Sequence, residues 1–242
     1  MPRIMKSRRM LFNEEVEGPK MGLAMICDLE GFSGLLAQAD VQSYVARFLN
    51  RIFKYVNINI YGGTPYWLDD KSRLPALLKP VHVKFLGDGL LHLWVPPHGC
   101  RDFDQDFVTE LMNRMWNFKT FFEASIRRCS DDVPLLELPK RIRFGFAKGS
   151  VFELTRRDNG HREYIGFCIN LAARLQKYCP EIGLIASARL DLPKKILKQN
   201  RYQKLIATRL RGFPKEIVFV DSNDLTELDT KTKQSLFEEL GS

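Results

Sequence analysis

Two aspartates of the sequence stand beside glycine at the ends of apolar stretches. Asp28 closes the run MGLAMICDL over 21–29, and Asp88 lies between Gly87 and Gly89, with an apolar run on either side. Carboxylate oxygens are the ligands that Mg²⁺ and Mn²⁺ prefer, and two of them at one place leave coordination positions open for phosphate groups. Aspartate beside glycine is also common in turns, so each residue alone is better explained as a turn residue.

Asn170 and Arg174 form a second candidate pair. They lie four residues apart in a segment, about 167–178, whose apolar residues have helical spacing. Residues four apart share one face of a helix. An arginine there suits a reaction in which negative charge grows on phosphate oxygens. By itself, however, such a pair is usually part of a solvated helix face.

The elements that must position the two aspartates follow from the apolar pattern. The run 21–29 predicts a buried strand, and the segments 81–86 and 90–95 predict a β-hairpin because only three residues, two of them glycine, separate them. If the first strand pairs between the two hairpin strands, both carboxylates reach one edge of the sheet.

The rest of the chain alternates between helical and strand patterns. Helices are predicted over 35–58, 103–129, 167–178, 188–198 and 224–240, a second hairpin over 141–154 around Lys148-Gly149, and further strands over 183–187, 202–209 and 215–221. This order predicts an α+β fold, a largely antiparallel sheet with helices packed on it. We expect a basic arm over 1–20, one domain over 21–221 and a helical tail over 222–242.

Composition narrows the class of protein. The 242 residues carry a net charge of +8, in short scattered clusters and without a nucleic-acid-binding motif, which favours a polyanionic small substrate over nucleic acid. The five cysteines are widely spaced, so neither a disulfide framework nor a zinc site is expected. Free cysteines of this kind are typical of the reducing cytoplasm, where we expect the protein to be located. No secretory signal and no apolar run of about 18 residues occurs, so no membrane association is expected.

Three stretches resemble the signature motifs of class III adenylate and guanylate cyclases, in the order of that family. They are Asp28-Leu29-x-Gly31-Phe32-Ser33, Lys84-Phe85-Leu86-Gly87-Asp88-Gly89, and Gly166-x-x-Ile169-Asn170-Leu171-Ala172-Ala173-Arg174-Leu175. The resemblance covers roughly 21–221 and implies a cyclase-like fold with a βααββαβ core. It also implies an activity, the conversion of a nucleoside triphosphate into a 3′,5′-cyclic nucleotide and pyrophosphate.

The resemblance implies a metal site as well. Asp28, Asp88 and the backbone carbonyl of Leu29 match the ligands of two divalent metal ions, Mn²⁺ or Mg²⁺. One ion would lower the pKa of the ribose 3′-hydroxyl, and the other would hold the β- and γ-phosphates. The turn at Phe32 and Ser33 would offer backbone N–H groups to the triphosphate.

The remaining roles implied by the resemblance belong to the substrate. Asn170 matches a ribose-orienting asparagine, Arg174 a transition-state arginine, and Arg211 a phosphate-binding lysine. In this family the metal aspartates come from one subunit and the Asn/Arg pair from the other. The resemblance therefore implies a head-to-tail homodimer with its sites at the interface.

Two positions bear on the choice of base. Lys84 stands where adenylate cyclases carry lysine, and a cationic donor opposes the N1–H and amino donors of guanine. Glu163 stands where adenylate cyclases often carry aspartate or threonine, and its extra methylene suits a smaller pyrimidine ring. A bare catalytic core with an insertion over 61–80 also resembles the stand-alone bacterial pyrimidine cyclases that make cyclic UMP or CMP against phage.

We therefore expect a pyrimidine cyclase that makes a second messenger in bacterial antiviral defence. An adenylate cyclase is the first alternative. A non-catalytic, cyclase-like nucleotide-binding module is the second, although such modules usually lack one of the metal aspartates or the arginine.

Overall fold

The computed structural model describes residues 11–12, 17–38, 40–63, 74–131, 133, 137–156, 160–193 and 201–240. The strands are β1 (Lys20–Leu29), β2 (His82–Phe85), β3 (Gly89–Trp94), β4 (Ile142–Thr155), β5 (Arg162–Gly166), β6 (Leu184–Ser187), β7 (Tyr202–Ala207), β8 (Glu216–Asp221) and β9 (Phe237–Glu239). The helices are α1 (Phe32–Leu36), α2 (Val45–Tyr61), α3 (Gln105–Thr120), α4 (Phe122–Ser130), α5 (Phe167–Gln176), α7 (Ser222–Glu227) and α8 (Thr230–Leu236), with 3-10 turns η1 (Val41–Ser43) and η2 (Ala188–Leu190).

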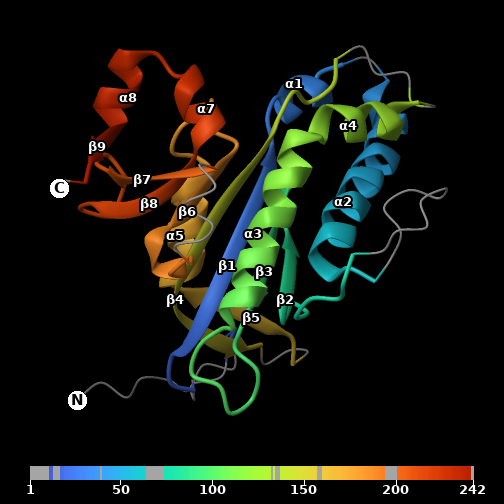
Figure 1. The fold of residues 1–242 in the computed structure, drawn as a ribbon. Helices are drawn as coiled ribbons and strands as arrows, with labels where there is room; N and C mark the ends of the chain where they lie inside the picture. Colours follow the sequence, from blue (N-terminus) through green and yellow to red (C-terminus); the bar gives the residue numbers. More distant parts are fainter. Residues whose placement is uncertain are drawn as a thin grey trace, which may run out of the picture.

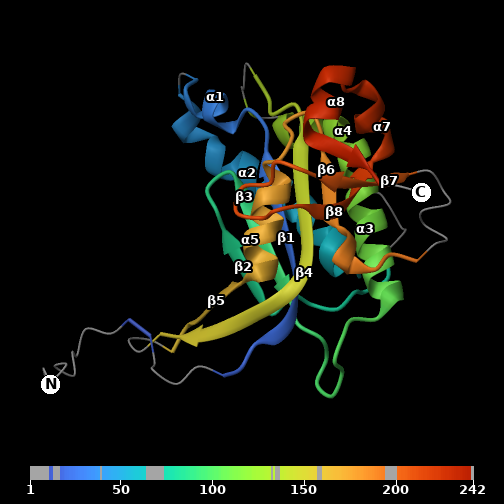
Figure 2. The same ribbon diagram turned by 90° about the vertical axis from the view of Figure 1, so that its left-hand side faces the viewer.

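The strands form one sheet in the order β2-β3-β1-β4-β6-β8-β7-β9, and β5 pairs with β4 off this path. Among the described strands, only β4 and β6 pair in parallel. Helices α2, α3 and α4 cover one face of the sheet and α5 covers the other (Figures 1 and 2). The α+β fold predicted from the sequence, a largely antiparallel sheet with helices on it, is confirmed.

β1 lies at the centre of this arrangement and is buried on both faces. Met25 and Cys27 pack into the cluster beneath α2, α3 and α4, whereas Ala24 and Ile26 pack beneath α5. A strand covered on both sides reads as a continuous apolar run, which is why the pattern over 21–29 was informative. The same alternation puts Asp28 on the α5 face of the sheet.

The predicted hairpin over 141–154 is wrong, because this segment is the single strand β4. Lys148 and Gly149 stand opposite Leu23 and Gly22 of β1, in the middle of a continuous antiparallel ladder. A side chain at Gly149 would lie 2.6 Å from the ring of Phe167 at the start of α5. The glycine therefore marks a close approach of α5 to the sheet rather than a turn. β4 does form a hairpin, but with β5.

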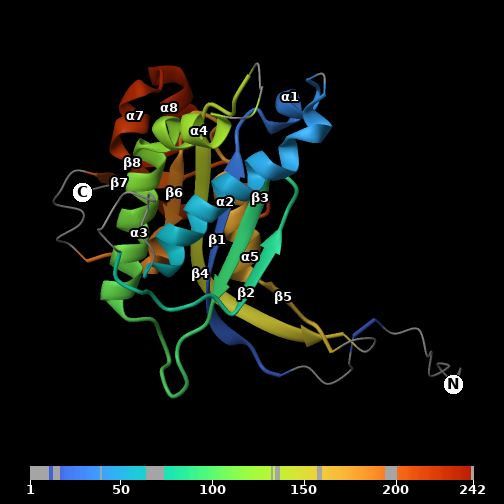
Figure 3. The same cartoon turned by 90° about the vertical axis from the view of Figure 1, so that its right-hand side faces the viewer.

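The expected position of the first strand is also corrected. β1 does not lie between the two hairpin strands; it pairs with β3 on one side and with β4 on the other. β2 instead forms the edge of the sheet next to β3 (Figure 3). Because Asp28 stands opposite Gly89 in the β1–β3 ladder, the two aspartates still reach one place.

Several predicted helices are interrupted. The segment 35–58 contains the end of α1, all of η1 and most of α2, and the segment 103–129 divides into α3 and α4 at Phe121. The segment 224–240 is not one helix: the Asp229 carboxylate accepts a hydrogen bond of 2.9 Å from the Thr232 amide and starts α8 anew. The chain then enters β9, which pairs with β7.

Some predictions concern residues outside the described ranges. They include most of the basic arm over 1–20, the centre of the insertion over 61–80, and the segment 194–200 of the predicted helix after 188. Within the described ranges, no helix has the length and apolar character needed to cross a bilayer.

His92 of β3 makes the stability of the fold pH-dependent. Its ring is fully buried, and Nε2 lies 3.2 Å from the side-chain oxygen of Asn57 on α2. Burial lowers the pKa of His92 to about 3. The unfolded chain takes up a proton near the ordinary pKa of about 6.5, whereas the folded chain does not until about 3. Stability is therefore lost as the pH falls through this window.

We predict that His92 alone removes about 2 kcal/mol of stability between pH 7 and pH 5. His92→Gln keeps a polar partner for Asn57 but cannot take up the proton. Urea unfolding of both proteins at the two pH values measures the difference. The wild type should lose this amount more than the variant, and equal losses in both would contradict the assignment.

Candidate active site

The backbone itself brings Asp28 and Asp88 together. The Leu29 amide donates a hydrogen bond of 3.1 Å to the Asp88 carbonyl, which ties the end of β1 to the turn of the β2–β3 hairpin. A side chain at Gly89 would lie 1.9 Å from the Cys27 carbonyl oxygen, so β1 approaches this strand closely only because residue 89 is glycine. Gly87 has a φ of +98°, a left-handed conformation that the tight turn requires.

Asp28 is held by two residues that the sequence analysis missed. Its Oδ2 accepts a hydrogen bond of 2.5 Å from Nη2 of Arg143 and one of 3.0 Å from Nε2 of Gln176. Arg143 stands directly opposite Asp28 on β4, and Gln176 is the last residue of α5. The signal for Arg143 was its register on β4, which the mistaken hairpin over 141–154 concealed.

The electrostatics of Asp28 indicate a place for a cation. The residue is only 6% exposed, and burial raises the pKa of its carboxyl. The charge of Asp88 and a side-chain hydrogen bond with it raise this pKa further, whereas Arg143 lowers it. The β1–β3 register and the Leu29–Asp88 backbone hydrogen bond bring the two carboxylates close together at the end of β1. Like charges this close are stabilised by a divalent cation that both can bind.

The donor set fits such a cation. Two carboxylates and the Leu29 carbonyl offer hard oxygen ligands, and the described residues contain no group of three or more His, Cys, Asp or Glu side chains that would enclose the ion. Mg²⁺ and Mn²⁺ sites of this kind complete their coordination with water and phosphate oxygens. Nearby, Nε of Arg143 and Oε1 of Gln176 are buried without a hydrogen-bond partner in the described part of the chain.

Lys84 and Glu163 form a direct ion pair. The Lys84 ammonium lies 2.7 Å from Oε2 of Glu163, although the residues belong to β2 and β5. β5 lies against β2, since the rings of His82 and Tyr164 are 5.1 Å apart. The hydrogen bond from Lys84 lowers the pKa of Glu163, which therefore stays an acceptor at neutral pH. The pair offers one donor and one acceptor side by side.

Asn170 and Arg174 lie on the outer face of α5. The inner face of this helix is apolar and packs on the sheet, with Leu171 and Leu175 fully buried. Both polar side chains are exposed, and no described residue forms a hydrogen bond or ion pair with either of them. An unpaired polar pair on an otherwise packed helix is available to a ligand or to another molecule.

The two faces of α5 separate these residues from the carboxylates of their own chain. Gln176 reaches Asp28, and Arg174 stands two positions before it on the helix. Two positions correspond to a rotation of about 200°. Arg174 therefore points away from Asp28, and no contact joins Asn170 or Arg174 to the carboxylate pair within the described ranges.

Arg211 lies in a connection that runs along α5. The loop begins beside Tyr178, just after the end of the helix, where the Thr208 amide donates a hydrogen bond of 3.0 Å to the Tyr178 hydroxyl. It ends beside Phe167 at the start of the helix, where the rings of Phe213 and Phe167 are 5.4 Å apart. The loop thus contacts residues at both ends of α5, and Arg211 is exposed on it.

The turn after β1 contributes backbone and one side chain. Phe32 is buried against the core and Ser33 is exposed at the start of α1. No described acceptor is bonded to their amide groups outside the helix. The structure therefore gathers the predicted residues into three groups: Asp28, Leu29 and Asp88 with the turn; Lys84 with Glu163; and Asn170, Arg174 and Arg211 along α5.

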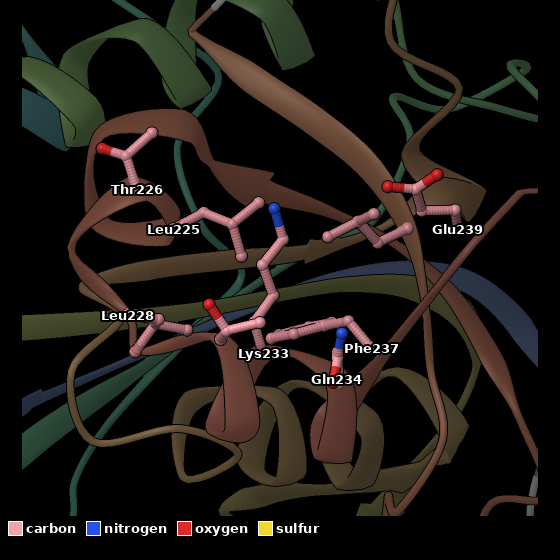
Figure 4. Close-up of a pocket in the computed structure, with 9 residues that line it drawn as sticks. Leu225, Thr226, Leu228, Lys233, Gln234, Phe237 and Glu239 are labelled. Carbon is pink, nitrogen blue, oxygen red and sulfur yellow. The ribbon is translucent and has the colours of Figure 1, made fainter.

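Two cavities lie away from these groups. One, of about 410 Å³, is lined by Leu205, Leu225 and Phe237 with Lys233 and Glu239 at its rim (Figure 4). The other, of about 400 Å³, lies between the end of α3 and the start of α7 and is lined by both acidic and basic side chains. Neither contains a residue that the sequence analysis assigned to the site.

Solved nucleotidyl cyclases share this architecture. The crystal structure of the guanylyl cyclase Cya2 matches with a TM-score of 0.57 over 86% of this chain and 93% of its own, at 14% sequence identity. The adenylyl cyclase CyaB from P. aeruginosa matches with a TM-score of 0.57 over 85% and 95%, at 15% identity. The chain has the fold of a class III nucleotidyl cyclase catalytic domain.

A third solved structure extends the comparison. The catalytic core of a rhodopsin-guanylyl cyclase with converted specificity, in complex with ATPalphaS, matches with a TM-score of 0.54 over 86% of this chain and 99% of its own, at 17% identity. No family model and no curated protein sequence matches the chain. The likeness to known cyclases is therefore one of fold.

We predict that Mn²⁺ stabilises the protein through the facing carboxylates. At a hundredfold excess over its Kd, the ion should add about 2.7 kcal/mol to the free energy of unfolding and raise the Tm by several degrees. Asp88→Asn should abolish this shift. The metal-free variant should melt no lower than the wild type, because the substitution removes like-charge repulsion.

Thermal melts with and without Mn²⁺ measure both effects. Asp102→Asn is the matched control, because Asp102 pairs with Lys148 at 2.9 Å and is not part of the carboxylate pair. That variant should keep the Mn²⁺ shift. An undiminished shift in Asp88→Asn would contradict the metal site.

Proposed function

We propose that the protein is a nucleotidyl cyclase that converts a nucleoside triphosphate into a 3′,5′-cyclic nucleotide and pyrophosphate. The observation that carries the proposal is the pair of facing carboxylates at the end of β1 in a cyclase fold. Burial and like charge oppose this pair, and Arg143 offsets part of the charge of Asp28. A divalent cation bound to both acids would offset the repulsion that remains.

Asp28, Asp88 and the Leu29 carbonyl would hold two divalent ions, Mn²⁺ or Mg²⁺. Ions at such a site activate a ribose hydroxyl and neutralise charge on the phosphates. Arg143 and Gln176 bind one oxygen of Asp28 and so fix the direction of the other. The backbone N–H groups of Phe32 and Ser33 would bind phosphate oxygens next to this pair.

The residues on and beside α5 would bind the rest of the substrate. Asn170 would orient the ribose through its side-chain amide, and Arg174 would stabilise the charge that develops on the α-phosphate oxygens. Arg211 would bind the outer phosphates. All three side chains are exposed and have no hydrogen-bond or ion-pair partner among the described residues, which supports their use for a ligand.

A second copy of the chain would complete each site. Because Arg174 points away from Asp28 of its own chain, the carboxylates of one copy would face the Asn170–Arg174 pair of another. A head-to-tail homodimer with two equivalent sites meets this requirement. Exposed apolar side chains on β2 and β5 support such an interface, among them Phe85 at 57% and Ile165 at 55% exposure.

The Lys84–Glu163 pair would recognise the base of the nucleotide by hydrogen bonding. Its donor and acceptor are complementary to uracil, cytosine and adenine. It would disfavour guanine where the Lys84 ammonium faces the N1–H and amino donors of that base. We favour a pyrimidine, because the longer side chain of Glu163 suits a smaller ring. An adenylate cyclase is the alternative. We also propose a role in bacterial antiviral signalling, because the insertion over 61–80 resembles that of bacterial pyrimidine cyclases.

Turnover of ATP, GTP, CTP and UTP, each supplied separately with Mn²⁺, tests the proposal when the products are identified by mass. We predict a 3′,5′-cyclic product from UTP or CTP. Asp88→Ala should lower the rate by a factor on the order of 10³, because it removes an electrostatic element of the site. Asp102→Ala, away from the site, should leave the rate within about twofold of the wild type.

The outcomes separate the alternatives. Turnover of ATP with none of UTP or CTP would contradict the pyrimidine preference and leave the cyclase assignment intact. No cyclic product from any of the four nucleotides would contradict the cyclase assignment and favour a module that only binds nucleotide.

A further inference from the structure

The hydroxyl of Tyr178 joins three segments that are distant in the sequence. Tyr178 follows α5, and its hydroxyl donates a hydrogen bond of 2.5 Å to the Leu236 carbonyl at the end of α8. The same oxygen accepts hydrogen bonds from the amides of Thr208, at 3.0 Å, and Arg209, at 3.3 Å. A phenolic hydroxyl offers one donor and two acceptor positions, so its capacity is fully used here.

The two amides belong to the loop that carries Arg211. Their anchoring sets where the loop leaves β7, and Leu210, which is 3% exposed, then enters the core beneath α5. Phe213 secures the far end of the loop against Phe167. Arg211 lies between these two anchors, so its position along α5 depends on both of them.

The C-terminal segment is the third partner of the hydroxyl. The Leu236 carbonyl also accepts a hydrogen bond of 3.1 Å from the Thr208 hydroxyl, and it shares the single amide proton of Thr208 with the Tyr178 hydroxyl, each acceptor lying 3.0 Å from the amide nitrogen. The rings of Tyr178 and Phe237 are 5.4 Å apart in an edge-to-face arrangement. The end of α8, the start of β9, the loop and the end of α5 thus meet at one tyrosine.

α8 lies mostly outside the core. None of its residues is buried, although its last residue, Leu236, packs against the core. The cavity of about 410 Å³ lies between α8, α7 and the sheet, with Phe237 in its wall (Figure 4). The β9–β7 ladder and buried Phe237 hold the C-terminal segment on the sheet, and the hydrogen bonds at Leu236 connect it to the loop.

We propose that Tyr178 is a positioning residue. Its hydroxyl connects the loop of Arg211 to the C-terminal segment and so holds the loop in place for phosphate binding. The proposal rests on the proposed function, because it assigns Arg211 to the triphosphate. Tyr178 would affect phosphate binding through the position of Arg211, without itself touching the substrate. Loss of the hydroxyl would weaken binding and leave the chemical step intact.

Tyr178→Phe tests the proposal, because the ring keeps its contact with Phe237 and only the hydroxyl is lost. KM for the nucleotide that is turned over should rise about tenfold, with kcat within about twofold. Arg211→Ala should raise KM similarly, and the double variant should add little to either, as expected for residues that act through one another. Tyr202→Phe is the matched control: this buried tyrosine contacts the Met112 carbonyl instead, and KM should stay unchanged.

Hydrogen exchange of the backbone amides over 208–213 and 230–240 measures this connection without any substrate. Faster exchange of both segments in Tyr178→Phe, but not in Tyr202→Phe, supports the proposal, and unchanged exchange overturns it. The exchange measurement tests the role of Tyr178 even when no cyclic product is made. The absence of a product would contradict the proposed function instead. Two kinetic outcomes overturn the proposal and leave the cyclase assignment standing. In the first, KM rises in Arg211→Ala but is unchanged in Tyr178→Phe. In the second, KM is unchanged in Arg211→Ala itself.

Discussion

The meeting of Asp28 and Asp88 at the end of a buried strand is the interaction on which the rest of the site depends. It is unfavourable in itself, because burial and like charge both oppose two ionised carboxylates. The fold nevertheless enforces it through the backbone, by the Leu29–Asp88 hydrogen bond and by a contact at Gly89 that leaves no room for a side chain. Arg143 and Gln176 then both donate to one oxygen of Asp28, Oδ2.

Helix α5 imposes a second constraint by serving two purposes on opposite sides. Its inner side packs on the sheet and ends in Gln176, which binds Asp28. Its outer side carries Asn170 and Arg174 and is flanked by the loop of Arg211. A rigid helix cannot turn both sides toward one place, so the two halves of the candidate site point apart within a chain. The homodimer that we propose would bring the two halves of a site together from two chains.

The sequence predicted the parts that depend on local patterns. A continuous apolar run and a glycine-rich triplet were enough to find β1, the β2–β3 hairpin and both aspartates. The same reasoning failed over 141–154, because a glycine marks either a turn or a close approach, and only the ring of Phe167 distinguishes the two. Lys84 and Glu163 were predicted from a resemblance, since no local pattern joins residues on β2 and β5.

The residues that sequence reasoning missed act through long-range contacts. Gln176 and Tyr178 are ordinary polar residues at the end of an amphipathic helix, and their partners lie 148 residues before and 58 residues after them. Their roles depend on where α5 ends relative to β1 and to the C-terminal segment. No periodicity or spacing encodes that distance, and only the folded chain shows it.

The central claim is that each site takes its carboxylates from one chain and its Asn/Arg pair from another. Complementation tests it directly. Asp88→Asn and Arg174→Ala chains, co-expressed with different tags and purified by both, give a heterodimer with one intact site of two. The account predicts about half of the wild-type activity from this heterodimer, although each variant alone is inactive. A heterodimer as inactive as its parents would show that both halves of a site come from one chain.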